Sequence, residues 1–308
     1  MKLLLLGDLH FRLSNPRNRL DSYVDAFKCK MTQVFDYANK NYVDAILCPG
    51  DFFDTPQPSY STLIEFVDLI ANTPVRILGA LGNHDCINIE TRRHTALNIA
   101  TQLCFLGALH VGYQDTVLLD NNICLHFRSY THYIDDPEKK SYQIRKAPGL
   151  NILIAHGMIL PEPAPFTHTL VENVETDADV VLCGHYHLPF IKKHNGTLFI
   201  NPGSLMRSSA GSGDMNRTPQ FVVLDTETLE YEIVQLQAAP GYEVLDRTEL
   251  DEKKEQEAAM SEFVELAKAQ IDLTEFNIME VIESVSKLKN VPQNIKEKAV
   301  ELIKMELK

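Results

Sequence analysis

Five short apolar runs between residues 1 and 183 end in a similar way. Each run is followed by glycine or histidine, with side chains that can bind metal ions close by. The runs are Met1–Leu6, Asp44–Pro49, Val75–Leu81, Asn151–Ala155 and Val180–Cys183. A short apolar run bounded by glycine predicts a buried strand. Because open α/β sheets place ligands at the carboxyl ends of their strands, we expect the polar residues after these runs to share one edge.

Between the first predicted strands, apolar residues recur at the spacing of a helix. Residues 20–40 repeat apolar positions at this spacing, and a second helix follows either Ser59 or Ser61 as its N-cap. A third is expected over Thr91–Leu103. This alternation of strands and helices predicts a mainly α/β domain.

The middle of the chain changes to short strands, which predict a hairpin-rich second sheet. The strands expected in this sheet are His110–Val111, Thr116–Leu119 and Ile123–Phe127. Later strands are expected over Thr197–Ile200, Gln220–Leu224 and Tyr231–Val234. Residues 135–148 are polar and expected to be exposed. Residues 201–218 are rich in glycine and serine, and we expect a mobile loop near the site.

The composition shifts near Ala238, which divides the chain into an expected domain over 1–238 and a helical region over 239–308. Apolar stripes predict helices over Glu252–Ile271, from Thr274 and from Pro292. Three short helices bury little surface among themselves. Their stripes therefore either pack on the first domain or dock on a partner, as a helix in a groove.

Composition narrows the class of protein without fixing the substrate. The chain has 308 residues, 44% hydrophobic residues and a net charge of −13. This charge disfavours non-specific attraction to nucleic acid, although bound divalent cations would reverse the local field. Six cysteines without a C-x-x-C pair indicate free thiols in a reducing, cytoplasmic compartment. The first apolar run stops at Gly7, so we expect no signal peptide and no membrane span.

Seven side chains beside the predicted strand ends are candidate metal ligands: Asp8, His10, Asp51, Asn83, His156, His185 and His187. Mixed imidazole and oxygen donors suit Mn²⁺, Fe, Zn²⁺, Co²⁺ or Ni²⁺ better than Ca²⁺. Seven groups exceed one tetrahedral site and suit two cations roughly 3.5–4 Å apart. We expect Asp51 to be central, since a carboxylate can bridge two cations.

The spacing within two of the motifs bears on which ligands share a cation. Asp8 and His10 stand two residues apart on an extended segment, so both can face one cation. The same spacing separates His185 from His187, but a turn after Gly184 breaks the alternation. These two histidines can therefore belong to different cations.

The motifs Gly7-Asp8-Leu9-His10, Gly50-Asp51-Phe52-Phe53-Asp54, Gly82-Asn83-His84-Asp85, Ala155-His156-Gly157 and Gly184-His185-Tyr186-His187 together resemble those of the calcineurin-like metallophosphoesterases. The resemblance implies a four-layer α-β-β-α sandwich, here with a C-terminal helical appendage. It implies one metal held by Asp8, His10, Asp51 and His187, and a second held by Asp51, Asn83, His156 and His185. It also implies that His84 stands over the scissile phosphate.

Within that superfamily, residues 50–60 resemble the bacterial SbcD and Mre11 nuclease branch. The branch implies a Mn²⁺-dependent DNA exonuclease and endonuclease of DNA repair and recombination. Its partner is an ATPase of the SbcC/Rad50 type, gripped by a C-terminal helical segment, and a homodimer is compatible with it. Residues 201–205 look more like the small single-domain phosphodiesterases.

Candidate catalytic and substrate-binding residues accompany the ligands. His84, oriented by Asp85 or by a backbone carbonyl, could stabilise transition-state charge or protonate the leaving alkoxide. The alternative is that His84 only supports a neighbouring metal ligand. Arg207 and Arg217 are expected to contact phosphates, with solvated side chains as the alternative.

Three classes of function follow. A DNA nuclease subunit is favoured over a phosphodiesterase or phosphatase acting on a small nucleotide or a phosphoprotein. A non-catalytic scaffold is disfavoured because a competent residue fills every ligand position.

Overall fold

The chain divides into two compact units, Met1–Leu245 and Asp246–Lys308. The computed structural model describes residues 1–86, 95–103, 108–120, 122–209, 211–248, 251–253, 255–256, 260–261, 297–298 and 301. Most of the expected C-terminal helices lie outside these residues. The first unit extends past the boundary expected near residue 238.

Six strands form the first sheet, in the order β14-β13-β1-β2-β3-β4. Their bounds are β1 (Lys2–Leu5), β2 (Ala45–Cys48), β3 (Ile77–Gly79), β4 (Leu109–Val111), β13 (Gln220–Asp225) and β14 (Tyr231–Gln235). The first four are parallel, whereas β13 and β14 are antiparallel additions. We expected β4 in the second sheet. It lies in the first because the helix before it returns the chain beside β3, as in a βαβ unit.

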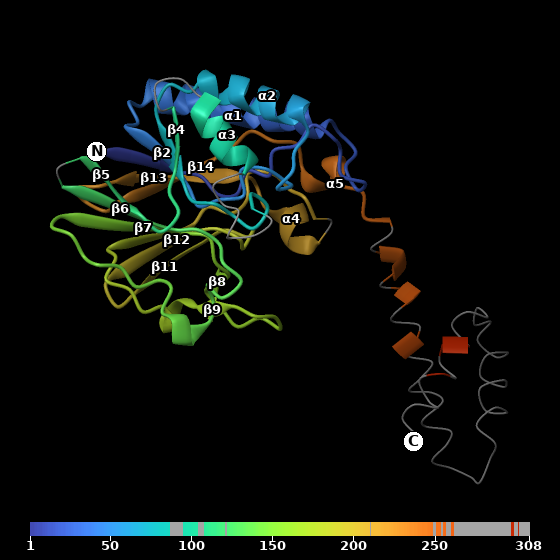
Figure 1. The fold of residues 1–308 in the computed structure, drawn as a ribbon. Helices are drawn as coiled ribbons and strands as arrows, with labels where there is room; N and C mark the ends of the chain where they lie inside the picture. The colour runs from blue at the N-terminus through green and yellow to red at the C-terminus, as the bar shows by residue number, and fades with distance from the viewer. Residues whose placement is uncertain are drawn as a thin grey trace, which may run out of the picture. The chain divides into compact units, whose positions relative to one another are not determined.

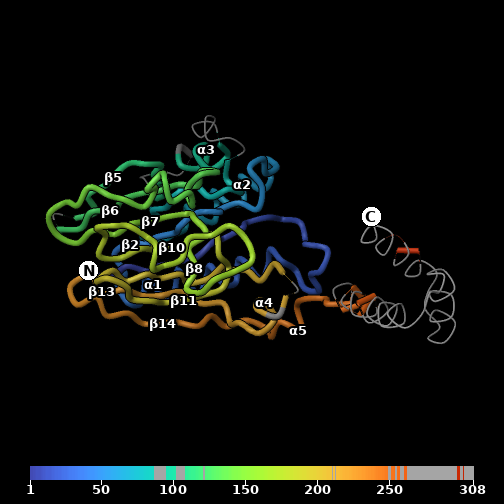
Figure 2. The backbone as a smooth tube through the Cα atoms, turned by 90° about the horizontal axis from the view of Figure 1, so that it is seen from below, coloured from blue at the N-terminus to red at the C-terminus, as the bar shows by residue number. Residues whose placement is uncertain are grey.

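The second sheet also has six strands, in the order β11-β12-β10-β7-β6-β5. Their bounds are β5 (Thr116–Asp120), β6 (Ile123–Arg128), β7 (Leu150–Ala155), β10 (Val180–Cys183), β11 (Phe190–His194) and β12 (Thr197–Asn201). In Figure 2, β5, β6, β7, β10 and β11 follow one another in this order. The four central strands are parallel, so hairpins occupy only the two edges.

Alternating side chains divide the core between the layers. On β1, Leu3 and Leu5 enter the apolar layer between the sheets, whereas Leu4 faces the helices. On β7, Ile152 points between the sheets and Leu153 points to the opposite face. This is the two-residue period of a strand buried on both faces. It explains why the predicted strands are apolar at consecutive positions.

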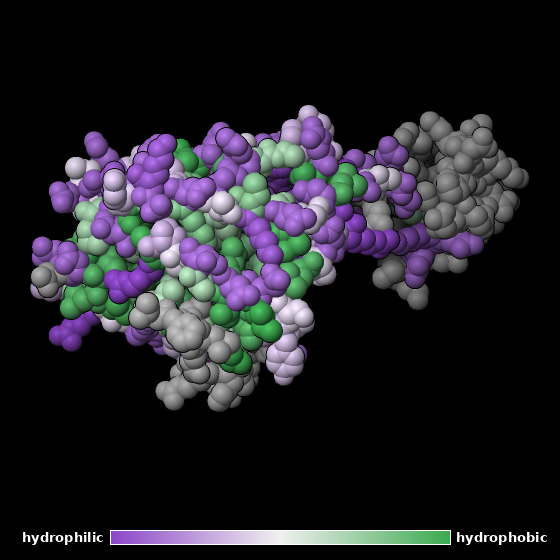
Figure 3. Space-filling view, turned by 90° about the horizontal axis from the view of Figure 1, so that it is seen from above, coloured by the Kyte–Doolittle hydropathy of each residue, from purple (hydrophilic) through white to green (hydrophobic). Residues whose placement is uncertain are grey.

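Three helices cover the outer face of the first sheet (Figure 1): α1 (Tyr23–Lys40), α2 (Tyr60–Ala71) and α3 (Ala96–Leu103). The Ser22 hydroxyl caps α1, and Ser59 rather than Ser61 caps α2 by accepting from the Thr62 N–H at 3.1 Å. Hydrophilic residues interleave with smaller hydrophobic areas on this side of the molecule (Figure 3). The short helices α4 (Ser212–Asn216) and α5 (Gly241–Val244) come later in the chain.

The layer outside the second sheet consists of short elements and loops. The elements are the 3₁₀ helices η3 (Pro137–Lys139) and η4 (Val171–Asn173) and the paired strands β8 (Ile159–Leu160) and β9 (Thr169–Leu170). Residues 135–148 are not simply exposed, because Tyr142 and Ile144 are buried against this sheet. The polar residues of the segment conceal these two anchors.

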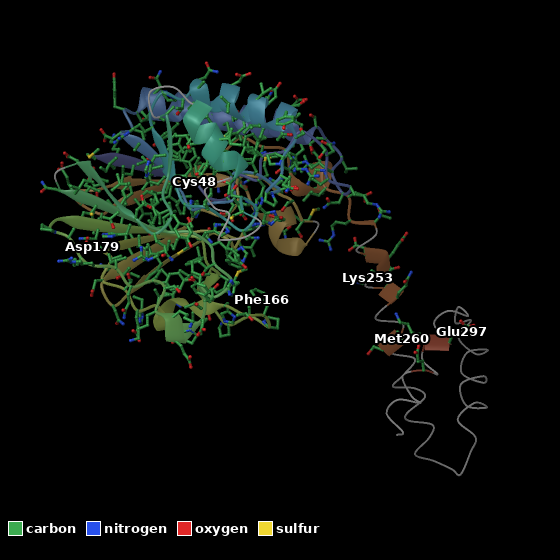
Figure 4. All side chains as sticks on the ribbon, in the orientation of Figure 1. Cys48, Phe166, Asp179, Lys253, Met260 and Glu297 are labelled. Atoms are coloured by element: carbon green, nitrogen blue, oxygen red, sulfur yellow. The ribbon has the colours of Figure 1, made fainter. Side chains whose placement is uncertain are left out.

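Two further expectations concern cysteines and membranes. Cys29, Cys48, Cys124 and Cys183 are free thiols, and Cys48 lies in the interior of the first unit (Figure 4). Cys104 lies outside the described residues. Within the described part of the chain, no helix combines the length and apolar character needed to cross a membrane.

Candidate metal centre

The carboxyl ends of strands from both sheets meet at one cluster of polar side chains. Asp8 and His10 follow β1, Asp51 follows β2 and residues 83–85 follow β3 in the first sheet. From the second sheet, His156 follows β7, and His185 and His187 follow β10. All of these segments were predicted from the apolar runs before them. Packing of the two sheets brings their side chains together.

One group of four side chains consists of Asp8, His10, Asp51 and His187. Each offers a ligand atom within 4.8 Å of the other three. Nε2 of His10 lies 3.0 Å from Nε2 of His187 and 3.6 Å from Oδ2 of Asp51. These atoms converge on one point, although the two histidines are 177 residues apart in the sequence.

A second group consists of Asp51, His156 and His185. Nε2 of His156 is 3.4 Å from Oδ2 of Asp51 and 3.0 Å from Oδ1 of Asn83, which adds an amide oxygen. Asp51 therefore belongs to both of these groups. His185 and His187 fall in different groups, which is the division that their spacing left open.

Three of these residues have backbones in the left-handed region, with φ of 50° at His10, 48° at Asp51 and 73° at His185. Such conformations cost about 1–3 kcal/mol each and cluster at functional sites. They turn the chain sharply after each strand. Gly50 has a φ of 140°, and a Cβ atom there would lie 2.5 Å from Nδ1 of His156. Glycine is therefore required immediately before Asp51.

Backbone hydrogen bonds hold the turns against one another. The N–H groups of Leu9 and His10 both donate to the carbonyl oxygen of Asp51, at 3.0 and 2.8 Å. The His185 N–H donates to Oδ2 of Asp8 at 2.8 Å. The site is thus fixed by contacts between the loops.

Residues 201–205 support the site, a role that the sequence did not indicate. The Leu205 N–H donates to the Asp8 carbonyl at 2.8 Å, and the Ser204 N–H donates to the His187 carbonyl at 3.1 Å. The Asn201 amide donates to the carbonyl of Tyr186 at 2.7 Å. The segment expected to be a mobile loop therefore begins by holding two turns that carry candidate ligands.

Burial and the charges of neighbouring groups together set the pKa values of the site. It raises the pKa of Asp8 to about 7 and lowers the pKa values of His10 and His185 to about 3 each. Burial alone would raise the pKa of Asp51, but the charge of His156 holds it well below its usual range. Burial opposes protonation of His156, yet the Asp51 carboxylate raises its pKa to about 9. Neutral His10 and His185 beside ionised Asp51 are in the protonation states that bind metal.

The residues fit divalent cations. Oδ1 of Asp8, Nδ1 of His10 and Nδ1 of His156 are buried and have no hydrogen-bond partner within the described residues. Leaving buried polar atoms unpaired is costly, so each such atom requires an explanation. A set of imidazole nitrogens and carboxylate oxygens is typical of sites for Mn, Fe or Zn. Coordination in this cluster would compensate the crowding of its carboxylates.

His84 and Asp85 have different surroundings. Nδ1 of His84 lies 2.8 Å from the carbonyl oxygen of Asp54, so a backbone carbonyl orients the ring. The buried carboxylate of Asp85 accepts instead from the N–H groups of Phe52, Phe53 and Gly82. The alternative in which Asp85 orients His84 is therefore not observed. Asp85 holds together the turns after β2 and β3.

Arg207 and Arg217, which were expected to contact phosphates, form hydrogen bonds and an ion pair within the chain. Arg217 forms an ion pair of 2.6 Å with Asp214 and donates to the Ser204 and Met206 carbonyls. Arg207 donates to the carbonyls of Arg217 and Ala239. These bonds order the segment that was expected to be mobile. Sequence shows the charge of an arginine but not the carbonyls that it will meet.

Comparison with known proteins agrees with this geometry. The model of the calcineurin-like phosphoesterase superfamily domain matches residues 1–229. The chain belongs to this superfamily. Members bind a dinuclear metal centre, and the two groups that share Asp51 provide candidate ligands for one here. One solved structure shares 12% sequence identity with this chain. The similarity covers 77% of this chain and 99% of that chain with a TM-score of 0.52, and it supports the fold alone.

Two curated relatives of this phosphoesterase are described as nuclease or DNA repair proteins. The DNA double-strand break repair protein Mre11 of Methanosarcina mazei is 25% identical over 252 residues, 75% of this chain and 37% of that protein. A subunit of the nuclease SbcCD of Staphylococcus epidermidis is 25% identical over 265 residues, 74% of this chain and 66% of that protein. The chain thus spans between about a third and two thirds of their lengths.

Two further residues line the site without having been predicted. The Tyr130 ring lies 5.6 Å from the His185 ring and 6.2 Å from that of His156, centroid to centroid. It follows β6, so the rule about strand ends could have found it. Oδ2 of Asp54 forms an ion pair of 2.6 Å with Nη1 of Arg12, and Oδ1 of Asp54 lies 4.0 Å from Nδ1 of His10. This aspartate ends the motif that starts at Gly50.

Proposed function

We propose that this phosphoesterase is a DNA exonuclease and endonuclease subunit of the SbcD and Mre11 type, which cleaves phosphodiesters with two divalent cations. The observation that carries the metal chemistry is that Asp51 belongs to both the Asp8 group and the His156 group of candidate ligands. Asp8, His10, Asp51 and His187 would hold one cation, and Asp51, Asn83, His156 and His185 the other. Mn²⁺ is the first choice, with Fe, Zn²⁺, Co²⁺ and Ni²⁺ as alternatives.

When bound, two such cations would polarise phosphate oxygens and would make hydroxide available near neutral pH. The residues of the chain supply the remaining chemistry. His84 is half-buried, and its Nδ1 faces the Asp54 carbonyl. That bond makes Nδ1 the donor and leaves Nε2 to meet the substrate. A protonated Nε2 can give its proton to the leaving alkoxide, while the bond to the carbonyl keeps the ring in this orientation.

The relatives support DNA as the substrate and an ATPase as the partner. They are named as a double-strand break repair protein and as part of a nuclease. We therefore propose an SbcC/Rad50-like ATPase as partner, docked on helices within residues 239–308, a cytoplasmic location and a homodimer as the working assembly. The free thiols among the described residues fit a reducing compartment.

A second candidate is a phosphodiesterase or phosphatase acting on a nucleotide or a phosphoprotein. It is favoured by the net charge of −13 and by the internal bonding of Arg207 and Arg217. A long nucleic acid is held mainly through its phosphates, which requires available cations. A small diester needs only the metal centre.

One experiment separates the two candidates. Manganese-loaded protein is incubated with single-stranded DNA, duplex DNA and bis-p-nitrophenyl phosphate, with Asp51→Ala as the control for contaminating nucleases. If the protein is a nuclease, the native protein should shorten the DNA and Asp51→Ala should not. Cleavage of the small diester with intact DNA would instead support the second candidate.

A further inference from the structure

A cavity of about 150 Å³ lies among residues that take no part in the metal centre. Its walls come from the segment before α1, from α1 itself, from Arg207 and from the chain after β14. Its charged lining residues are Arg19, Asp21, Lys30 and Arg207. The volume is roughly ten times the ~15 Å³ that one water molecule requires, so the cavity can hold a small polyatomic ligand.

Lys30 is the most unusual of these residues. Its side chain lies on α1 and is 5% exposed, and its ammonium contacts the Ala26 carbonyl at 3.4 Å and the Met206 sulfur at 3.3 Å. The carbonyl belongs to the helix itself, and a thioether is a weak acceptor. No carboxylate within the described part of the chain forms an ion pair with this lysine. A buried cation without an anion is costly to the fold.

The neighbouring arginines increase the positive charge. Arg207 is also 5% exposed, and the groups that accept its hydrogen bonds are neutral carbonyls. Arg19 forms an ion pair with Asp21 and donates to the Arg207 carbonyl at 2.9 Å. Three cations against one carboxylate leave two positive charges around the cavity. Burial, followed by Arg19 and Arg207, lowers the pKa of Lys30 to about 8.

We propose that this cavity binds a phosphate dianion at a site separate from the metal centre. The ligand is a free phosphate ion or the phosphate of a phosphomonoester. Its two negative charges match the excess of two cations, and guanidinium and ammonium donors form strong, charge-assisted bonds to phosphate oxygens. Entry from solvent is open, since the lining residues Cys29, Gln237 and Ala238 are exposed.

The site has a direct structural link to the metal centre. Arg207 comes directly after Leu205 and Met206 in the chain. The Leu205 N–H donates to the Asp8 carbonyl, and the Met206 carbonyl accepts a hydrogen bond from Arg217. A phosphate that draws Lys30 and Arg207 together would therefore stabilise the segment that supports the turn at Asp8. This link gives the site a means of sensing phosphate near a phosphoesterase centre.

The test must separate this site from binding of phosphate to the metals. Asp51→Ala disrupts the proposed metal centre, so this variant, freed of residual metal by dialysis against a chelator, should still show one site per chain in a calorimetric titration with inorganic phosphate. Adding Lys30→Met should abolish this binding. Lys28→Met is the matched control, because Lys28 lies on the same helix with its own partner, Glu65, at 2.6 Å. It should leave the stoichiometry unchanged.

A second variant avoids a substitution in the protein core, which could prevent folding. Cys29 is exposed and lines the cavity, so Cys29→Asp adds a negative charge at the site with little risk to the fold. It should weaken binding of phosphate by about tenfold through repulsion. Absence of phosphate binding in Asp51→Ala, or unchanged binding after both Lys30→Met and Cys29→Asp, would overturn the proposal.

The source of the phosphate is identified in the same Asp51→Ala protein. Inorganic phosphate is compared with a deoxynucleoside 5′-monophosphate and with oligonucleotides that carry or lack a 5′-phosphate. Binding of inorganic phosphate alone supports the free ion. Tighter binding of the 5′-phosphorylated oligonucleotide than of its unphosphorylated counterpart supports a phosphate terminus.

Discussion

The carbonyl oxygen of Asp54 lies 2.8 Å from Nδ1 of His84. A backbone carbonyl can only accept a hydrogen bond, so this contact fixes the proton of a neutral His84 on Nδ1. Nε2 is then directed to the other side of the ring, away from the carbonyl. The relationship assigns different tasks to the two nitrogens of one imidazole.

His84→Ala should keep both metals and lose most turnover. The expected loss is roughly two to four powers of ten if Nε2 acts as acid or stabilises charge. Turnover is measured on a diester with a poor leaving group, with elemental analysis for the metals. Normal turnover on that substrate would show that His84 has only a structural role.

Asp51→Ala should lower the metal content below two ions per chain and abolish hydrolysis. The reason is that Asp51 belongs to both the Asp8 group and the His156 group. His185→Ala should abolish hydrolysis too, but it removes a residue of one group only. Elemental analysis that finds two tightly held ions in Asp51→Ala would contradict the bridging role.

Asp85→Ala should destabilise the protein more than it affects the chemistry directly. It leaves the N–H groups of Phe52, Phe53 and Gly82 without their acceptor, at 3.2, 3.0 and 2.9 Å in the native chain. Unpaired buried donors cost about 1–3 kcal/mol each, so a loss of roughly 3 kcal/mol or more is expected. Denaturant unfolding measures it, with Asp85→Asn, which keeps one acceptor oxygen, as the milder comparison. Equal stability of all three proteins would refute the role of Asp85 as a clamp.

Lys30 should make stability depend on pH in alkaline solution. Burial, Arg19 and Arg207 lower its pKa from 10.5 to about 8, with Asp21 as the opposing charge. Between these values the unfolded chain binds more protons than the folded chain, so stability rises with pH. Below pH 8 the folded chain bears the full cost of the charge. In phosphate-free buffer, Lys30→Met should therefore be more stable than the native protein below pH 8, by a margin that shrinks toward pH 10.5. A constant margin across denaturation curves would contradict this assignment.

The role of the C-terminal residues can be tested by truncating the chain just after the first compact unit, which ends at Leu245. Val244 and Leu245 are buried, and the Leu20 N–H donates to the Val244 carbonyl at 3.1 Å. A chain of residues 1–248 should therefore stay folded and cleave a small diester, whereas one ending at 238 should have a lower thermal midpoint. If the tail docks on a partner, the 1–248 chain should lose ATP-stimulated cleavage of duplex DNA and co-purification with an SbcC-like protein. Precipitation of the 1–248 chain would instead show that the tail belongs to the core.

The sequence predicted the class of fold and the strand ends because both depend on local patterns. Apolar runs before Gly7, Gly50 and Gly184 identify buried strands, and their order places Asp8, Asp51 and His185 at strand ends. The α/β class with two sheets is confirmed. Ser59 could be named as a cap since its hydroxyl acts within one turn of helix.

The remaining features depend on partners distant in the sequence. The burial of Tyr142 follows from its packing on a face of the second sheet, which its own polar neighbours do not reveal. The internal bonds of Arg217 depend on carbonyls at Ser204 and Met206, whose positions follow from the fold of the loop. The pairing of β4 with β3 was missed for a similar reason, since strand pattern does not identify the neighbouring strand.

The distance along the chain between the candidate ligands has a consequence for biosynthesis. Asp8 and His10 leave the ribosome first, yet their companion His187 follows 177 residues after His10, and β13, which pairs with β1, comes later still. Contacts of such long range form late, because the intervening chain must close before they contribute. A nascent chain therefore carries the first pair of candidate ligands without a complete site during most of its synthesis. Binding of metal at the complete site would then follow translation of the domain.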